Sequence, residues 1–435
     1  MDKLIVEGGT PLRGRIKVSG AKNACLPILA AVLLSDDESI IRNVPDLKDV
    51  NTMLDILTGL GRKAVREKDV VRISGGIVDR PVAPYELVST MRASICVLGP
   101  LLGRYHEAKV SFPGGCVIGP RPIDLHIKGL KALGTVIKVE EGYIIASAPK
   151  LTGTRIYLGG HFGSSVLATA NTLMAAVLAE GDTVIEDAAG EPEVADLANM
   201  LAKMGARIEG IGTATIRVRG VKKLKGVDYT IISDRIEAGT FLIAAVLTDG
   251  KLFIEGASAE HNLALIDKLE ECGGSVEEKQ GGLEACRATR SIRPTHITTL
   301  PYPGFPTDLQ AQMMSLSAMS DGISVITEKI YPERFIHVSE LNRMGAEIML
   351  EGASAIIKGV KRLSGAPVMA SDLRASAALV LAGLVADGRT EISRIYHLDR
   401  GYEHIEEKLS AVGARVRREK EKKKSSQGKA PGKGV

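Results

Sequence analysis

Apolar and polar positions follow a pattern that occurs six times along the chain. An apolar, helix-like run ends in glycine, and a stretch rich in β-branched residues follows; these glycines are Gly61, Gly134, Gly205, Gly273, Gly345 and Gly413. Glycine just past a helix is the usual left-handed terminator. Because successive glycines are about 70 residues apart, we predict six copies of one small α/β unit, which is too long for a solenoid repeat.

Each unit also contains one Ala-rich segment with polar residues at its start. These segments are apolar around most of their circumference, which predicts buried helices over residues 21–34, 91–103, 164–181, 234–250, 307–322 and 372–388. Alternating runs predict strands over 70–74, 143–147, 216–218 and 355–358. A second, amphipathic helix is expected in each unit, as over residues 194–204.

Six units divide naturally into two domains of three, so the predicted fold class is α/β (α+β). We expect the first domain to cover residues 21–228 and the second to combine residues 1–20 with 229–414, because the strands near 4–6 and 16–19 would complete its sheets. Residues 415–435 are expected to form a disordered basic tail. The chain would then cross between the domains twice, near residues 20 and 229, which suits a hinge.

Composition narrows the class of protein. With 45% hydrophobic and 25% charged residues, the chain is typical of a soluble globular protein. Five cysteines without a Cys-x-x-Cys motif favour a reducing cytoplasm, and no apolar run is long enough for a membrane span. No metal-ligand pattern or dinucleotide fingerprint occurs, so neither metal nor cofactor is expected. The net charge of +4 comes from the tail, for which we favour a solvated terminus over nucleic-acid or membrane binding.

The starts of the buried helices carry the first candidate chemistry. Ser, Asp and Asn are expected there as caps, but Lys22, Arg92 and Arg374 are not. A cation meets the unfavourable end of the helix dipole unless an anion lies between them. We therefore favour an anionic ligand for these cations over fixed ion pairs.

A loop rich in glycine and proline, residues 111–125, contains Cys116 and Arg121. A nearby guanidinium favours the thiolate, the nucleophilic form of cysteine. The same position in later units carries arginines, Arg334 and Arg400. Opposed domains would bring Lys22, Arg121 and Arg400 together around a small, multiply charged anion such as phosphate.

Several motifs resemble those of the bacterial UDP-N-acetylglucosamine 1-carboxyvinyltransferases, a family of enolpyruvyl transferases. They include Ser19-Gly-Ala-Lys22-Asn23-Ala, Phe112-Pro-Gly-Gly-Cys116, Phe305-Pro-Thr-Asp308 and Asp399-Arg400-Gly-Tyr, and the resemblance runs from about residue 3 to residue 416. It implies an inside-out α/β barrel with buried parallel helices in each domain. It also implies a cytoplasmic enzyme that transfers the enolpyruvyl group of phosphoenolpyruvate to the 3-hydroxyl of UDP-N-acetylglucosamine, in peptidoglycan precursor synthesis.

The resemblance also implies roles for individual residues. Cys116 would be the proton donor and the target of the epoxide fosfomycin, and Asp308 the base near the sugar hydroxyl. Lys22, Arg121 and Arg400 would hold the phosphate and carboxylate. Further substrate-binding positions would be Asn23, Arg92, Pro122, Ile123, Asp124, Leu125, Ser165, Val166, Ile330, Arg334, Asp372 and Arg374.

One segment departs from the family pattern. The family usually has Ser-Val-Gly-Ala-Thr at the third buried helix, often after a lysine, whereas this chain reads Gly163-Ser-Ser165-Val166-Leu167-Ala-Thr169. Uridine diphosphate is expected to bind more weakly or differently here. Two alternatives stay open: a shikimate-pathway enolpyruvyl transferase, which is not expected to carry the Cys116 loop, and a catalytically silent scaffold, which would not need Cys116 and Asp308.

Overall fold

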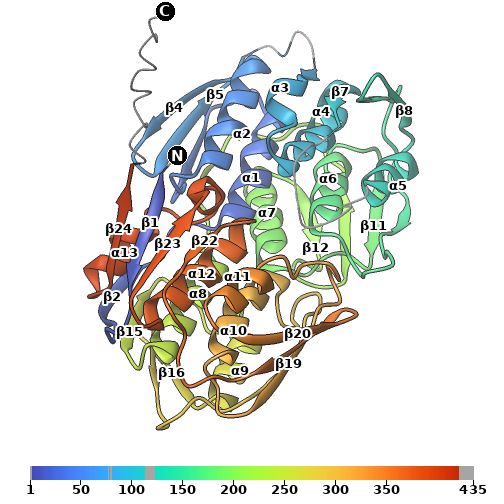
Figure 1. Cartoon of the computed structure of the whole chain (residues 1–435). Coiled ribbons are helices and arrows are strands. Elements are labelled where there is room, and N and C mark those ends of the chain that lie inside the picture. Colours follow the sequence, from blue (N-terminus) through green and yellow to red (C-terminus); the bar gives the residue numbers. More distant parts are fainter. Residues whose placement is uncertain (1, 77, 79–80, 113–122, 421–435) are drawn as a thin grey trace, which may run out of the picture.

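The structure is a computed structural model that describes residues 2–76, 78, 81–112 and 123–420. In this part of the chain, strands and helices alternate, which confirms the predicted α/β class (Figure 1). Cys116, Arg121 and Pro122 lie outside the described residues.

The described strands form six four-stranded sheets, and each sheet has one parallel pair followed by two antiparallel pairs. The repeat predicted from the glycine spacing therefore exists as a repeated sheet. Three sheets belong to the first half of the chain: β14, β3, β5 and β4 (Asp228–Thr230, Ser39–Arg42, Val70–Ser74, Lys63–Glu67); β6, β7, β9 and β8 (Val82–Ala83, Glu107–Ser111, Tyr143–Ser147, Val136–Glu140); and β10, β11, β13 and β12 (Arg155–Tyr157, Asp182–Glu186, Thr215–Arg219, Arg207–Glu209).

The other three sheets belong to the second half: β2, β15, β17 and β16 (Arg13–Lys17, Lys251–Glu255, Gly282–Arg287, Gly274–Lys279); β18, β19, β21 and β20 (His296–Thr298, Ile323–Thr327, Ser354–Lys358, Glu347–Glu351); and β22, β23, β1 and β24 (Pro367–Met369, Arg389–Ser393, Lys3–Glu7, Arg415–Glu419). The strands predicted over 70–74 and 143–147 have these bounds, and those predicted over 216–218 and 355–358 are longer by one or two residues.

One buried helix occurs in each of the six units, as the Ala-rich segments predicted. These are α1 (Lys22–Ala31) with the 3-10 turn η1 (Val32–Leu34), η2 (Arg92–Val97) with α4 (Leu98–Tyr105), α6 (Val166–Ala176), α8 (Arg235–Leu247), η4 (Thr307–Leu309) with α10 (Gln310–Ser317), and α12 (Leu373–Val385). The predicted helices at 91–103 and 307–322 instead begin as 3-10 turns, a tighter form common at helix ends.

Six further helices alternate with the strands of the described chain: α2 (Lys48–Gly59), α5 (Asp124–Ala132), α7 (Pro192–Lys203), α9 (Leu263–Glu271), α11 (Val338–Arg343) and α13 (Ile405–Ala411). Shorter turns are α3 (Tyr85–Val88), η3 (Glu260–Asn262) and η5 (Ile395–Arg400). None of the described helices combines the length and the apolar character needed to cross a membrane.

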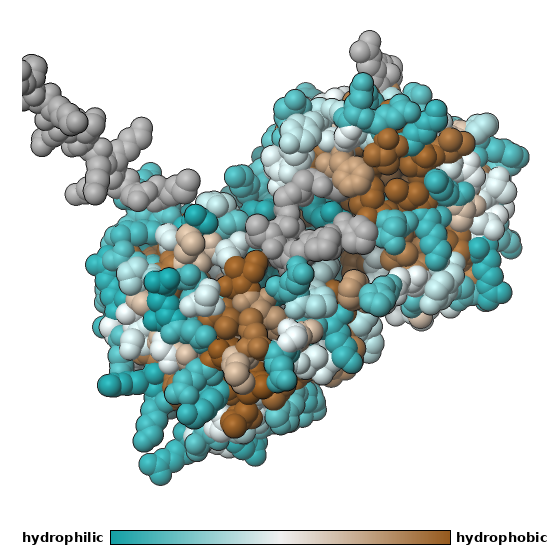
Figure 2. Space-filling model, turned by 45° about the vertical axis from the view of Figure 1, so that its right-hand side comes forward, coloured by the Kyte–Doolittle hydropathy of each residue, from teal (hydrophilic) through white to brown (hydrophobic). Residues whose placement is uncertain are grey.

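The described chain has two separate hydrophobic cores, and the space-filling view shows two lobes (Figure 2). The first core draws on residues from Ala21 to Ile231, where α4 packs on α6. The second draws on Leu4–Val18 and on residues from Ile236 to Val416, where α10 packs on α12 and α8 contacts both.

The two domains exchange their first strands. β2 precedes α1 in the sequence but pairs with β15, in a sheet of the second core. β14 precedes α8 but pairs with β3, and Tyr229 and Ile231 belong to the first core. We therefore propose a boundary between residues 232 and 233, instead of the expected 228 and 229, where a Gly20–Ser233 bridge joins the two crossing segments.

The disordered tail expected over residues 415–435 was placed too early in the chain. Residues 415–419 form strand β24, which pairs with β1, and are not a disordered segment. Val416 is buried, and the neighbouring arginines have partners: Arg417 bonds Glu7 at 3.0 Å, and Arg418 bonds Asp399 and Glu406 at 2.6 Å each. The charged residues of this segment therefore belong to a strand and form ion pairs with other parts of the chain. Residues 421–435 lie outside the described part.

Candidate active site

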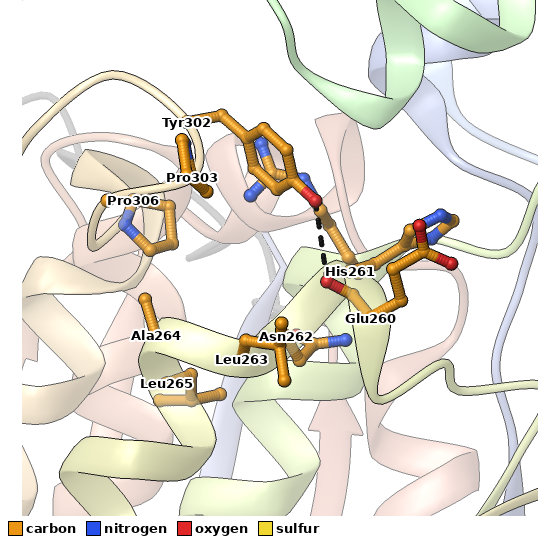
Figure 3. A pocket seen from close by; sticks show the side chains of 11 residues that line it. Glu260, His261, Asn262, Leu263, Ala264, Leu265, Tyr302, Pro303 and Pro306 are labelled. Atoms are coloured by element: carbon orange, nitrogen blue, oxygen red, sulfur yellow. Dashed lines mark hydrogen bonds between the residues drawn. The ribbon is translucent and has the colours of Figure 1, made fainter. Parts of the chain in front are cut away.

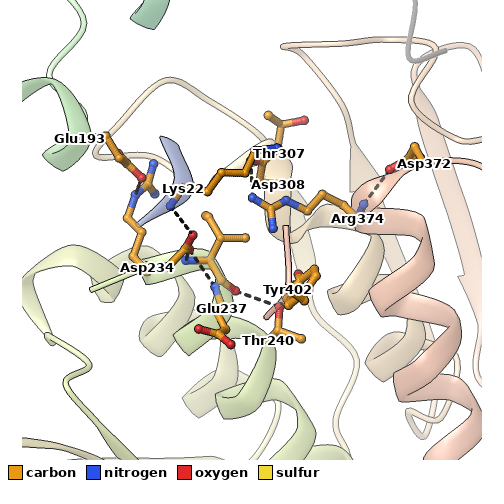
Figure 4. Close-up of polar contacts among 12 residues, drawn as sticks. Lys22, Glu193, Asp234, Glu237, Thr240, Thr307, Asp308, Asp372, Arg374 and Tyr402 are labelled. Atoms are coloured by element: carbon orange, nitrogen blue, oxygen red, sulfur yellow. Dashed lines mark hydrogen bonds and ion pairs between the residues drawn. The ribbon is translucent and has the colours of Figure 1, made fainter. Parts of the chain in front are cut away.

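The starts of four buried helices, α1, α8, η4 and α12, lie close together at the boundary between the two cores (Figure 4). Asp234 caps α8, because its Oδ1 accepts hydrogen bonds from the backbone N–H groups of Ile236 and Glu237 at 2.8 and 3.0 Å. Its Oδ2 also accepts the backbone N–H of Lys22, the first residue of α1, at 3.2 Å. One buried carboxylate thus binds the N-termini of two helices from different domains.

Asp308 lies between two guanidinium groups in the second domain. Its Oδ1 is 2.8 Å from Arg334 Nη1, and its Oδ2 is 3.1 Å from Arg374 Nη2. Desolvation opposes the charge on both buried arginines, but the carboxylate outweighs it and raises the pKa of each. The side chain of Asp308 itself is 24% exposed, so this carboxylate is fixed and still open to solvent.

Asp49, in the first turn of α2, binds two of the cations predicted from the sequence. Its carboxylate is 2.7 Å from Lys22 Nζ and 2.9 Å from Arg400 Nε. Burial alone would raise the pKa of Asp49, but Lys22 and Arg400 outweigh that effect and hold the pKa below its usual value. Because Arg400 is the last residue of η5 in the second domain, this ion pair also joins the domains.

Two of the three predicted anion ligands, Lys22 and Arg400, therefore converge, and Arg121 lies outside the described residues. The preference for a bound anion over fixed ion pairs stays a prediction, but Lys22 and Arg374 each form an ion pair with the protein in this structure. Carboxylates of the protein, Asp49 and Asp308, compensate these cations directly.

The predicted nucleotide-binding residues lie at the starts of α5 and α6. Ser165 is the N-cap of α6, and its Oγ accepts the backbone N–H of Ala168 at 3.4 Å. Val166 is partly exposed as the first residue of that helix. Ile123 is buried before α5, Asp124 is its exposed first residue, and Leu125 is partly buried.

The other predicted residues lie at the same domain boundary or next to it. Asn23 and Arg92 are partly exposed in the first turns of α1 and η2. Asp372 caps α12 through the backbone N–H groups of Arg374 and Ala375, at 2.8 and 3.0 Å. Ile330 donates its backbone N–H to Glu328 at 2.8 Å.

The sequence reasoning missed three carboxylates. Asp49 has no signal that separates it from an ordinary first-turn acid. Glu328 is fully buried and accepts hydrogen bonds from Thr299, Thr307, Ile330 and Tyr331, and its only sequence signal is its place directly after an apolar strand. Glu193 binds Arg235 at 2.9 Å across the domain boundary.

A small pocket lies beside the Glu193–Arg235 pair, in the second domain (Figure 3). Tyr302 covers it, with its hydroxyl donating to the carbonyl of Glu260 at 3.4 Å and its ring 5.6 Å from the Arg235 guanidinium. The pocket contains none of the residues predicted for the site.

Known proteins resemble this chain over nearly its full length. The family model of EPSP synthase (3-phosphoshikimate 1-carboxyvinyltransferase) matches residues 6–409. UDP-N-acetylglucosamine 1-carboxyvinyltransferase of Methylacidiphilum infernorum is 55% identical over 418 residues, which cover 96% of this chain and 99% of the relative. The enzyme of that name from Nitratidesulfovibrio vulgaris strain Hildenborough is 55% identical and covers 97% and 100%.

Solved structures give the same fold. The enolpyruvyl transferase NikO from Streptomyces tendae matches with a TM-score of 0.86 at 25% identity, over 96% of this chain and 98% of that one. EPSP synthase from Acinetobacter baumannii matches with a TM-score of 0.75 at 18% identity, over 96% and 100%. The two-domain α/β fold is therefore confirmed, and the chain belongs to the UDP-N-acetylglucosamine 1-carboxyvinyltransferases, within the wider EPSP synthase family.

Proposed function

We propose that this enzyme transfers the enolpyruvyl group of phosphoenolpyruvate to the 3-hydroxyl of UDP-N-acetylglucosamine and releases phosphate, the first committed step of peptidoglycan precursor synthesis. The observation that carries the proposal is the 55% identity to enzymes of that name over nearly the full chain. The meeting of Lys22, Arg400 and Asp308 at the domain boundary supports it.

The chemistry requires an acid, a base and cations. The sugar oxygen bonds to C2 of phosphoenolpyruvate, its proton passes to Asp308, and Cys116 donates a proton to C3. The C2–O bond to phosphate then breaks as a proton leaves C3, which restores the double bond. Proton transfer by a positioned side chain contributes about 100- to 10,000-fold in rate.

Arg334 and Arg374 bind both oxygens of Asp308 and so orient the carboxylate that we propose as the base. Lys22, Arg121 and Arg400 would hold the phosphate and carboxylate of phosphoenolpyruvate. An incoming phosphate would compete with Asp49 for Lys22 and Arg400, since that carboxylate already binds both. Fixed cations of this kind stabilise the charge of the intermediate, which is usually the largest catalytic contribution.

The remaining residues would bind the sugar nucleotide. Ser165, Val166 and residues 121–125 would contact the nucleotide, Asn23 and Ile330 the sugar, and Arg92 would support the Cys116 loop. Asp372 positions the first turn of α12 and therefore Arg374. We place the reaction in the cytoplasm, since the four cysteines of the described chain are free thiols.

Phosphate release from phosphoenolpyruvate tests the proposal. We expect release with UDP-N-acetylglucosamine as acceptor, none with shikimate 3-phosphate, and a loss in Cys116→Ala. The matched control is Cys286→Ala, a partly exposed thiol in β17 that should leave release unchanged. Absence of release from the wild type with UDP-N-acetylglucosamine would refute the proposed function.

Fosfomycin gives an independent check on the role of Cys116. Intact-mass spectra should show one covalent adduct on the wild type and on Cys286→Ala, but none on Cys116→Ala. An unmodified wild type in the presence of sugar nucleotide would count against Cys116 as the reactive thiol.

A further inference from the structure

A tight hairpin precedes helix α6. The backbone N–H of Gly160 donates to the carbonyl of Gly163 at 3.0 Å, and Gly163 returns the bond at 3.1 Å. The two residues at its tip are therefore His161 and Phe162. Gly163 has φ of +90°, a conformation that other residues rarely adopt, so the turn is well specified by its glycines.

Both ends of the hairpin are packed against neighbouring segments. A Cβ at Gly160 would lie 2.9 Å from Leu125 Cδ1, and a Cβ at Gly163 would lie 2.9 Å from Pro301 Cγ in the second domain. At Gly163 the positive φ and the proline ring favour glycine, whereas at Gly160 the Leu125 side chain would have to move to admit a Cβ. The hairpin thus holds its tip in a defined place between the start of α5 and the other domain.

Phe162 is an exposed aromatic side chain on this fixed support. Phe162 is 50% exposed. Its ring contacts the ring of His161 edge to face, with the ring centroids 4.7 Å apart and an angle of 78° between the ring planes. An edge-to-face contact covers at most one face of the phenyl ring, so a broad apolar face is available. Rigid aromatic rings of this kind bind planar ligands by stacking.

The hairpin tip lies next to the most open helix start of the first domain. Ser165, Val166 and Leu167 are partly exposed, whereas residues 168–176 of α6 are all buried. The backbone N–H groups of a helix start favour phosphate. A nucleotide whose diphosphate lies at this helix start would have its base within reach of a side chain three residues earlier in the chain.

We propose that Phe162 is a specificity-determining residue whose ring stacks on the uracil base of the sugar nucleotide. This inference rests on the proposed function, because it assumes that the nucleotide binds at Ser165 and Val166. The base is recognised by shape and by its planar face, and the diphosphate by the backbone of α6.

Kinetics of Phe162→Ala provide the first test. Base–aromatic stacking is worth about 1–3 kcal/mol, so we expect KM for UDP-N-acetylglucosamine to rise about 5- to 150-fold. The value of kcat and KM for phosphoenolpyruvate should stay unchanged, and Phe162→Tyr should restore the affinity. The control Met349→Ala removes another exposed apolar side chain, from β20, and it should change none of these constants.

The chain contains no tryptophan, which makes a direct test available. In Phe162→Trp the new indole is the sole tryptophan, and we expect uridine diphosphate to quench its fluorescence with a saturable curve. Ribose 5-phosphate, which lacks the base, should not quench it, and neither ligand should affect Met349→Trp.

The inference is overturned if Phe162→Ala keeps the wild-type KM in an enzyme that turns over, or if ribose 5-phosphate quenches as strongly as uridine diphosphate. Failure of the proposed function looks different, since the wild type would then release no phosphate with UDP-N-acetylglucosamine. In that case quenching by uridine diphosphate alone still decides whether Phe162 stacks on the base.

Discussion

The buried helices of the two domains begin differently. In the second domain, Asp234 and Asp372 each cap a helix through two backbone N–H groups, and Asp308 lies in the first turn of η4. In the first domain, α1, η2 and α6 begin after Ala21, Met91 and Ser165, with no acidic residue in their first turns. The first domain thus leaves its positive helix ends without carboxylates of its own.

This difference predicts separate roles for the two domains in the site. Helix starts without an acidic residue in their own first turn suit an anionic ligand, so we expect the first domain to bind phosphates of the substrates. The second domain supplies fixed carboxylates and the arginines that hold them. One carboxylate, Asp234, serves both sides, because it also binds the first N–H of α1.

The largest effect is expected from the acid of the second domain that has no capping role. Asp308→Asn should lower kcat about 1000-fold, because the amide cannot take the proton of the sugar hydroxyl. Initial rates of phosphate release measure the effect. Asp267→Asn, an exposed acid of α9, serves as control.

Loss of fold must be separated from loss of chemistry in Asp308→Asn. Arg334 and Arg374 lose a charged partner in this variant, so thermal unfolding is measured beside activity. A folded variant with near wild-type kcat would show that the second domain does not supply the base.

The next largest effect concerns the ion pair that joins the domains. Asp49→Asn leaves Lys22 and Arg400 without their carboxylate, and we expect about 3 kcal/mol less free energy of unfolding, measured with urea. Asp46→Asn, at an exposed acid three residues earlier, should cost far less. Equal costs would show that the buried pair does not hold the domains together.

The same pair predicts a pH dependence of stability. The pKa of Asp49 is lowered in the folded protein, so its contribution is complete above the unfolded value of about 4 and is lost as the pH falls through the folded pKa. The free energy of unfolding of the wild type, measured with urea, should therefore fall below about pH 4. In Asp49→Asn this acid-dependent part should be reduced, and an unchanged pH profile would assign it to other carboxylates.

A smaller effect compares two caps of the second domain. Asp234→Ala should cost about 2 kcal/mol, because it removes bonds to two helices, and Asp372→Ala about 1 kcal/mol. Both are measured by urea unfolding. If Asp372→Ala lowers the free energy of unfolding as much as Asp234→Ala does, the hydrogen bond from Asp234 to α1 contributes nothing to stability.

The smallest effect is expected at Ser165, the single side-chain cap among the described helices of the first domain. The hydrogen bond of Ser165 is long, at 3.4 Å, so Ser165→Ala should cost at most about 1 kcal/mol of unfolding free energy. A cost equal to that of Asp234→Ala would remove the difference between the two domains on which this comparison rests.

The sequence predicted what depends on local patterns. Helix starts, glycine terminators and the strands over 70–74 and 143–147 follow from residues close in the chain. The equivalence of loops between units also placed Lys22 and Arg400 together. Cys116, Arg121 and Pro122 lie outside the described residues, so their placement stays a prediction.

Features that depend on distant residues were not predictable in this way. The pairing of β14 with β3 joins segments far apart in the sequence, and no local pattern marks which sheet an edge strand enters. Asp49 looks like any first-turn acid until α1 and η5 bring two cations to it. The basic residues 415–419 looked solvated because their partners Glu7, Asp399 and Glu406 lie elsewhere in the chain.

The place of β1 has a consequence for biosynthesis. During translation the first domain has all of its strands once β14 has left the ribosome. The second domain must wait, because β1 lies between β23 and β24, the last strands to be made. The N-terminal residues 3–7 therefore need protection from wrong pairing throughout synthesis. A bulky fusion at this end would hinder the formation of the sheet that contains β1.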